Sequence, residues 1–226
     1  MSLKIYEDDQ GSEAWLEQRR GIVTASVIDA LITRSTVKPA NNESARRLIF
    51  KLACERITGR VADTYTSRAM MRGILDEPIA REYYEQHHAP VTQVGLMVLE
   101  RDGVRLGYSS DGLVGDHGAV EFKSREPEIH VATVLQNEPP AENVAQLQTA
   151  IYVAGLEWID YCSFSSGLPL WTKRVYPDPQ WQAAIPKAVK QAEDRITETI
   201  QRFRDTTKHC PPTEYVDHFG DMEIQL

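Results

Sequence analysis

SSDGLVGDHGAVEFKS, at residues 109–124, is the stretch that decides how this chain is expected to fold and where its chemistry lies. Asp111 follows an apolar run that predicts a strand, and the glycine after it is typical of a turn. Glu121 and Lys123 alternate around Phe122, so in a second strand both charged side chains project from the same face. If the two segments pair as a hairpin, Asp111 and Glu121 meet at one end of it.

Two carboxylates at one end of a hairpin suit a hard divalent cation such as Mg²⁺, with Mn²⁺ as a second choice. Lys123 beside them can position or deprotonate water, or neutralise charge that develops on a phosphorus atom. Without a cation, two adjacent carboxylates raise the pKa of one of them and cost stability. The alternative is a solvated hairpin edge on which Glu121 and Lys123 form a surface ion pair.

The rest of the chain predicts helices and strands around this stretch. Ser12 is expected to cap the first helix, and Gly21 and Gly59 to stand just past the ends of two helices. Helices are expected at residues 13–20, 24–32, 43–58, 67–87, 127–137, 142–154 and 178–206. Strands are expected at 94–100, 104–110 and 119–124, and as a pair at 157–165 and 168–176. The last helix is amphipathic, with an apolar face for core packing formed by Trp181, Ile185, Val189, Ile196, Ile200 and Phe203.

This order of elements predicts an α/β fold, of the α+β kind with a mixed sheet, in a single domain over residues 1–226. The composition, 42% hydrophobic and 26% charged, is that of an ordinary globular protein. The chain has no apolar run of the roughly 20 residues that a membrane helix needs, and its polar start lacks a signal-peptide core. Three scattered cysteines are too few for a disulfide framework or a four-cysteine metal site. A soluble protein of the cytoplasm, without a membrane partner, is expected.

The charge of the chain is unevenly distributed. Its net charge of −8 argues against a nucleic-acid partner. However, residues 1–72 hold 12 basic and 9 acidic side chains, whereas the remainder holds 13 basic and 24 acidic ones. The basic excess near the N-terminus indicates either a solvated face or a surface for an anionic partner.

Four segments together resemble a known family of nucleases. SSDG followed by EFK resembles the PD-(D/E)XK nuclease signature, with Ser110 where that pattern often has proline. Gln148-Thr-Ala-Ile-Tyr152 resembles the QxxxY element of its exonuclease branch. AWLEQRRGIVTAS at 14–26 resembles the opening motif of phage lambda exonuclease and the YqaJ-like viral recombinase nucleases, and RGILDEPIAREYYE at 72–85 resembles their glycine–acidic helix. The four segments stand in the family's order.

The resemblance implies a restriction-endonuclease-like PD-(D/E)XK core with added N-terminal and C-terminal helices. It implies that Asp111 and Glu121 bind Mg²⁺ together with the backbone carbonyl of Phe122. Lys123 would orient or activate the attacking water. Glu77, the first acidic residue of the motif, would assist through water on the metal.

The resemblance also implies a pocket for the 5′ phosphate at a DNA end, formed by Arg19, Ser26, Ser109 and Gln148. A guanidinium with hydroxyl and amide donors suits a terminal phosphate dianion. Without the resemblance, Arg19 is equally consistent with a surface charge, and Ser26 with a helix N-cap.

The roles of two further residues are left open by the sequence. Met70 lies where the family carries an apolar wedge that helps to separate the strands, although a core methionine is an equal alternative. After the lysine, lambda-type sequences often continue with Cys-Pro, whereas this chain has Ser124-Arg125. Arg125 could contact the phosphate backbone.

The implied activity is that of a Mg²⁺-dependent 5′→3′ exonuclease that processively degrades the 5′-phosphorylated strand of linear double-stranded DNA. It would release mononucleotides and leave a 3′ single strand for recombination by strand annealing. The implied assembly is a ring-shaped homotrimer that works beside a single-strand annealing protein, encoded by a phage or prophage and active in the bacterial cytoplasm. The alternatives are a PD-(D/E)XK endonuclease of the resolvase or restriction type, and a non-catalytic DNA-end-binding protein.

Overall fold

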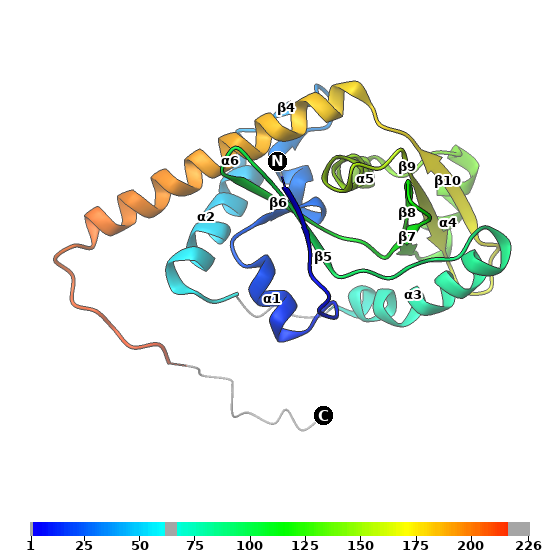
Figure 1. The fold of residues 1–226 in the computed structure, drawn as a ribbon, viewed down its shortest axis with the longest axis horizontal. Helices are drawn as coiled ribbons and strands as arrows, with labels where there is room; N and C mark the ends of the chain where they lie inside the picture. The colour runs from blue at the N-terminus through cyan, green and yellow to red at the C-terminus, as the bar shows by residue number, and fades with distance from the viewer. Residues whose placement is uncertain (1, 62–66, 217–226) are drawn as a thin grey trace.

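Two four-stranded sheets form the centre of the protein (Figure 1), in a computed structural model that describes residues 2–61 and 67–216. The first sheet has the strand order β1-β5-β6-β2, with bounds Ser2–Ile5, Leu96–Arg101, Val104–Ser109 and Val23–Thr24. The second has the order β10-β9-β8-β7, with bounds Trp171–Val175, Trp158–Phe164, Gly118–Ser124 and Gly112–Val114. The short strands β3 (Ile32–Thr33) and β4 (Lys38–Pro39) form a separate pair. The pairs β2–β6 and β8–β9 are parallel and the other pairs antiparallel, so the expected mixed α/β architecture is confirmed.

Residues 109–124 contain one more strand than the sequence predicts. β7 and β8 form an antiparallel hairpin in which Gly112 is opposite Val120 and Val114 is opposite Gly118. β7 is separate from β6 because the chain bends at Ser110 and Asp111. A side chain at Gly112 would lie 2.0 Å from Cγ1 of Val91, so glycine allows the neighbouring segment to approach the hairpin closely.

The helices begin and end close to the expected residues: α1 Glu13–Arg19, α2 Glu43–Thr58, α3 Arg68–His87, α4 Pro127–Gln136, α5 Ala141–Ala154 and α6 Pro179–Thr206. Ser12 accepts a hydrogen bond from the backbone N–H of Trp15 and caps α1, as predicted. Gly59 follows α2 with a φ of +69°, the left-handed conformation expected at a helix end. The segment Ala25–Leu31 is a 3₁₀ helix, η1, rather than an α-helix.

Alternate residues of the second sheet face different helices. Val120, Phe122 and Cys162 pack with Ala80 and Tyr84 of α3. Ala119, Ile159 and Tyr161 belong to the larger core, to which α5 contributes. Because successive side chains of a strand point to opposite faces, Glu121 lies on the α5 side of β8.

α6 packs along α2 and α5 (Figure 1). Trp181, Ile185, Val189 and Ile196 are buried, as the amphipathic pattern predicts. Phe203, expected on the same face, is 48% exposed, so the buried stripe ends before the helix does. No helix within residues 2–61 and 67–216 is both long and apolar enough to span a membrane.

Candidate active site

The hairpin brings Asp111 and Glu121 together. Gly112 is paired with Val120, so the next pair along the hairpin places Asp111 opposite Glu121. Oδ2 of Asp111 accepts a hydrogen bond from the backbone N–H of Phe122 at 2.8 Å. The two side chains are buried, at 8% and 2% exposure, so this is not a solvated hairpin edge.

Glu121 has one satisfied oxygen and one unsatisfied oxygen. Its Oε1 accepts hydrogen bonds from Nζ of Lys123 and Nε2 of Gln146, each at 2.5 Å. Its Oε2 is buried and has no hydrogen-bond partner among the described residues. An unpartnered buried carboxylate oxygen is costly, because buried polar atoms are nearly always satisfied. Such an oxygen fits a ligand to a cation.

The charges of the site perturb one another. Burial raises the pKa of Asp111 well above its usual range, and the negative charge of Glu121 raises it further. Burial alone would lower the pKa of Lys123, but attraction by Glu121 and Asp111 outweighs it and raises the pKa. Lys123 is therefore a protonated ammonium group at neutral pH, in contact with one carboxylate and close to the other.

Glu77 reaches the site from α3. It accepts a hydrogen bond from Arg81, one helical turn further on. Burial raises the pKa of Glu77; the charge of Arg81 opposes the shift and that of Glu121 adds to it. Glu77 and Ser110 also line a cavity of about 410 Å³ whose other wall includes the segment at residues 5–10. The cavity therefore adjoins the carboxylate site at Glu77 and Ser110.

The residues present fit a divalent cation. Within residues 2–61 and 67–216, no group of three or more His, Cys, Asp or Glu side chains is placed to hold a metal. Asp111 and Glu121, with the carbonyl of Phe122, the residue after Glu121, would instead supply few protein ligands. Mg²⁺ suits such a set, because it keeps several waters and takes phosphate oxygens.

A second cluster surrounds Arg19. Its Nη2 donates to Oγ1 of Thr24 at 3.3 Å and to Oγ of Ser26 at 3.4 Å. Its guanidinium carbon lies 4.2 Å from the ring centroid of Trp15, and Nε1 of Trp15 donates to Oγ of Ser109 at 3.1 Å. Burial lowers the pKa of Arg19, against the attraction of Glu55, so this cation is poorly solvated. The structure thus brings together three of the four residues expected in the phosphate pocket.

The structure does not bring Gln148 to this pocket, which corrects the expectation. Gln148 is 2% exposed; its amide donates to the carbonyl of Tyr176 and accepts from the N–H of Asp178, both at 2.8 Å. Gln146 instead lies against Glu121. Residues two apart on a helix point in nearly opposite directions, so only one of the two glutamines can face the site. The sequence AQLQ at 145–148 offers both candidates and does not distinguish between them.

The model of the YqaJ-like viral recombinase domain family matches residues 14–157, which contain both clusters. The chain belongs to this family. No curated protein matches the chain.

Solved structures resemble this YqaJ-like domain over most of its length. An alkaline exonuclease from Laribacter hongkongensis, LHK-Exo, is 29% identical with a TM-score of 0.77, over 87% of this chain and 98% of that one. The complex of LHK-Exo with dAMP is 28% identical with a TM-score of 0.76 over the same shares. A phage-related exonuclease from Haemophilus somnus 129PT, 11% identical, has a TM-score of 0.60 over 80% of this chain and 96% of that one, a likeness in fold alone.

Met70 lies on the surface of this YqaJ-like domain. It is 51% exposed on α3, beside the exposed side chains of Met71, Ile74 and Leu75. It is therefore not a core residue, and its role as a strand-separating wedge stays a prediction.

Much of the basic excess near the N-terminus is paired with acidic side chains. Arg34 pairs with Asp29, and Arg47 with Glu43, each at 2.7 Å. Arg56 forms a two-pronged ion pair with Glu193 of α6, at 2.6 and 2.7 Å. The count of basic residues therefore overstates the positive charge that is available to a partner.

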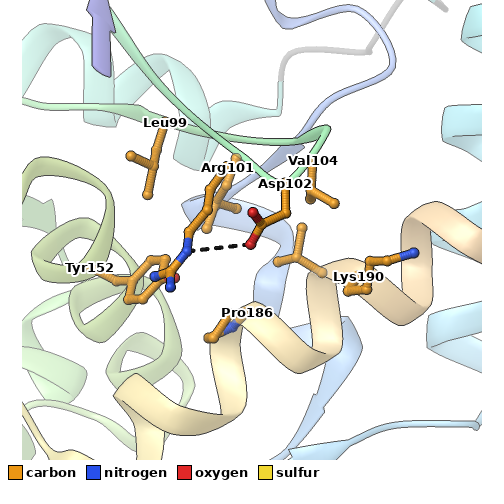
Figure 2. A pocket seen from close by; sticks show the side chains of 9 residues that line it. Leu99, Arg101, Asp102, Val104, Tyr152, Pro186 and Lys190 are labelled. Atoms are coloured by element: carbon orange, nitrogen blue, oxygen red, sulfur yellow. Dashed lines mark ion pairs between the residues drawn. The ribbon is translucent and has the colours of Figure 1, made fainter. Parts of the chain in front are cut away.

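A separate cavity of about 300 Å³ lies between the β5–β6 turn and α6 (Figure 2). Figure 2 shows the Arg101–Asp102 ion pair, 3.5 Å long, with Tyr152 on one side and Pro186 and Lys190 of α6 on another. None of its lining residues belongs to the carboxylate cluster or to the Arg19 cluster.

The raised pKa of Asp111 predicts a pH dependence of stability in the metal-free YqaJ-like domain. Folded Asp111 binds a proton more tightly than unfolded Asp111, whose pKa is near 3.8. The free energy of unfolding therefore falls as the pH rises from about 4 through the folded pKa, by at most about 1.4 kcal/mol per pH unit for one group. Asp111→Asn removes this contribution. The free energy of unfolding of the variant should therefore increase relative to that of the original protein as the pH rises. Urea unfolding in chelator from pH 4.5 to 8 measures the difference; a constant difference would contradict the prediction.

Proposed function

We propose that this chain is a divalent-metal-dependent exonuclease that degrades the 5′-phosphorylated strand of linear double-stranded DNA from its 5′ end. It would release mononucleotides and leave a 3′ single strand for recombination by strand annealing. The observation that carries the proposal is buried Glu121, opposite Asp111. One of its oxygens is held by Lys123 and Gln146, and the other has no partner among the described residues. Membership of the YqaJ-like family and the exonuclease relatives support a nuclease of the lambda exonuclease type.

Asp111, Glu121 and the carbonyl of Phe122 would hold Mg²⁺ or Mn²⁺. When bound, the cation would supply Lewis-acid stabilisation of charge on the phosphoryl oxygens. Lys123 is protonated, so it can orient water by donating hydrogen bonds and can neutralise charge that develops on the phosphate. Glu77 lines the neighbouring cavity, where its carboxylate can accept a hydrogen bond from water.

The Arg19 cluster would set the direction of degradation. The guanidinium of Arg19 contacts two hydroxyl groups, and Ser109 lies two residues before Asp111. Such donors suit a terminal phosphate, whose two negative charges distinguish it from an internal phosphodiester. Each cut would create a new 5′ phosphate for the same pocket, so the strand would advance by one nucleotide.

The assembly is part of the proposal. A ring-shaped homotrimer would enclose the DNA, so processive degradation would not require a high positive charge, in keeping with the net charge of −8. The enzyme would act beside a single-strand annealing protein in the cytoplasm of a bacterial host, encoded by a phage or prophage.

The test is digestion of a linear duplex with a 5′ phosphate on one strand and a 5′ hydroxyl on the other, with Mg²⁺ or chelator and beside a closed circle. We expect metal-dependent loss of the phosphorylated strand from its 5′ end while the circle stays intact. Arg19→Gln should lower the preference for the phosphorylated strand about tenfold, because one charge-assisted contact is lost. Arg47→Gln, at an exposed arginine of α2, is the control.

The other outcomes identify the alternatives. Cutting of the circle would favour an endonuclease, and tight end binding without cleavage would favour a non-catalytic end-binding protein. An unchanged strand preference in Arg19→Gln would remove Arg19 from the pocket and leave the activity in place.

A further inference from the structure

Arg125 continues the row of charged side chains on β8. Glu121, Lys123 and Arg125 are two residues apart, so extended backbone turns all three toward the same face. The backbone N–H of Arg125 donates to the carbonyl of Phe164 at 2.8 Å, which continues the β8–β9 pairing one residue beyond Ser124. The backbone of Arg125 is therefore held in line with β8. It lies about 7 Å along the strand from the backbone of Lys123, which is the rise of two strand residues.

The guanidinium of Arg125 is held by two neutral side chains. Its Nε and Nη2 donate to the hydroxyl of Tyr161 at 3.3 and 3.1 Å, and Nη2 also donates to Oδ1 of Asn143 at 2.5 Å. Tyr161 and Asn143 are buried. Asn143 stands one turn before Gln146 on α5, so the same helix contacts both ends of the charged row. The orientation of Arg125 is thus fixed by neutral side chains.

No carboxylate of the described residues contacts the guanidinium of Arg125. Among residues 2–61 and 67–216, Arg125 forms no ion pair, and its Nη1 makes no hydrogen bond to any described residue. By contrast, Arg72 contacts Glu126 and Arg56 contacts Glu193. A half-buried guanidinium whose contacts are neutral side chains is unfavourable unless an anion joins it. The arrangement suits an anionic ligand.

We propose that Arg125 binds a non-scissile phosphate of the strand being cut, the one adjacent to the phosphate that Lys123 contacts. This inference rests on the proposed function. The distance of about 7 Å along β8 is on the scale of one nucleotide step of a single strand. The planar guanidinium, whose Nη1 bonds to no described residue, matches the oxygens of a phosphodiester.

The test measures equilibrium binding of a 5′-phosphorylated duplex in chelator over a range of salt concentrations. Arg125→Gln should weaken binding about tenfold and reduce the slope of log affinity against log salt by about 1. Asn143→Asp should have the same effect although Arg125 is retained, because an isosteric carboxylate would neutralise the guanidinium. Arg202→Gln, on the exposed last turns of α6, is the matched control and should change neither quantity.

DNA in which single phosphates lack their negative charge shows which phosphate Arg125 contacts. A methylphosphonate adjacent to the scissile phosphate should weaken binding by the original protein about tenfold, and should add no further loss in Arg125→Gln. Additive losses, or an unchanged salt slope in both variants, would overturn the inference. Because these measurements need no cleavage, they test the Arg125 contact even if the protein does not cleave DNA. Thermal unfolding of Asn143→Asp is the folding control, and a Tm close to that of the original protein is expected.

Discussion

Replacement of Asp111 by asparagine is expected to lower the rate of DNA cleavage about a thousandfold. The amide has the shape of the carboxylate but lacks its charge, so it can neither hold a divalent cation nor couple electrostatically to Glu121. Single-turnover digestion of a 5′-phosphorylated linear duplex with Mg²⁺ measures the loss.

Metal binding provides a readout that does not depend on activity. A cation that binds only the folded state at 100 times its dissociation constant adds about 2.7 kcal/mol to the free energy of unfolding. We expect Mg²⁺ to raise the Tm of the original protein and to have little effect on Asp111→Asn. Asp116→Asn, in the exposed turn of the same hairpin, is the matched control and should keep both the activity and the thermal shift. A full thermal shift in Asp111→Asn would show that Asp111 is not a ligand.

Replacement of Lys123 by methionine is expected to lower the cleavage rate about a hundredfold to a thousandfold. Methionine keeps the unbranched shape but removes the ammonium group, which donates to Glu121 at 2.5 Å and is held protonated by two carboxylates. Unlike Asp111→Asn, this variant should retain the thermal shift caused by Mg²⁺. Rate measurements at saturating DNA, with thermal unfolding in parallel, test both statements.

Lys173→Met serves as the control for Lys123→Met. Lys173 lies on β10, two strands away, where it pairs with Glu138 near the surface. Its loss should leave the cleavage rate unchanged. If Lys123→Met abolished the Mg²⁺-dependent shift as well as cleavage, Lys123 would act by holding Glu121 in place rather than on the phosphate.

Local patterns predicted the helices well because caps and apolar spacing are short-range signals. Ser12 and Gly59 mark helix ends in the structure as they do in the sequence. The short strands β1 to β4 were missed because two to four residues carry too little alternation to be recognised. In addition, β1 and β2 pair with β5 and β6, which lie far along the chain.

The phosphate-pocket prediction failed at one residue for a similar reason. Gln146 and Gln148 have the same side chain on the same helix, and the rotation of α5 about its axis decides which one meets Glu121. That rotation is set by the packing of α5 against η1, β9 and α6. A single sequence contains no direct record of it.

Local sequence is enough to predict the carboxylate pair and the adjacent lysine. Asp111 and Glu121 are ten residues apart in one hairpin, so the pairing and the two-residue period of a strand suffice to bring them together. The other side chains of the site come from elements that are distant in sequence, so their identity depends on how the chain packs. Glu77 comes from α3, Gln146 from α5, and Trp15 reaches Ser109 across 94 residues of sequence. These contacts depend on how helices pack on opposite faces of the sheets, because packing of the whole core, not local backbone preference, fixes where such side chains point.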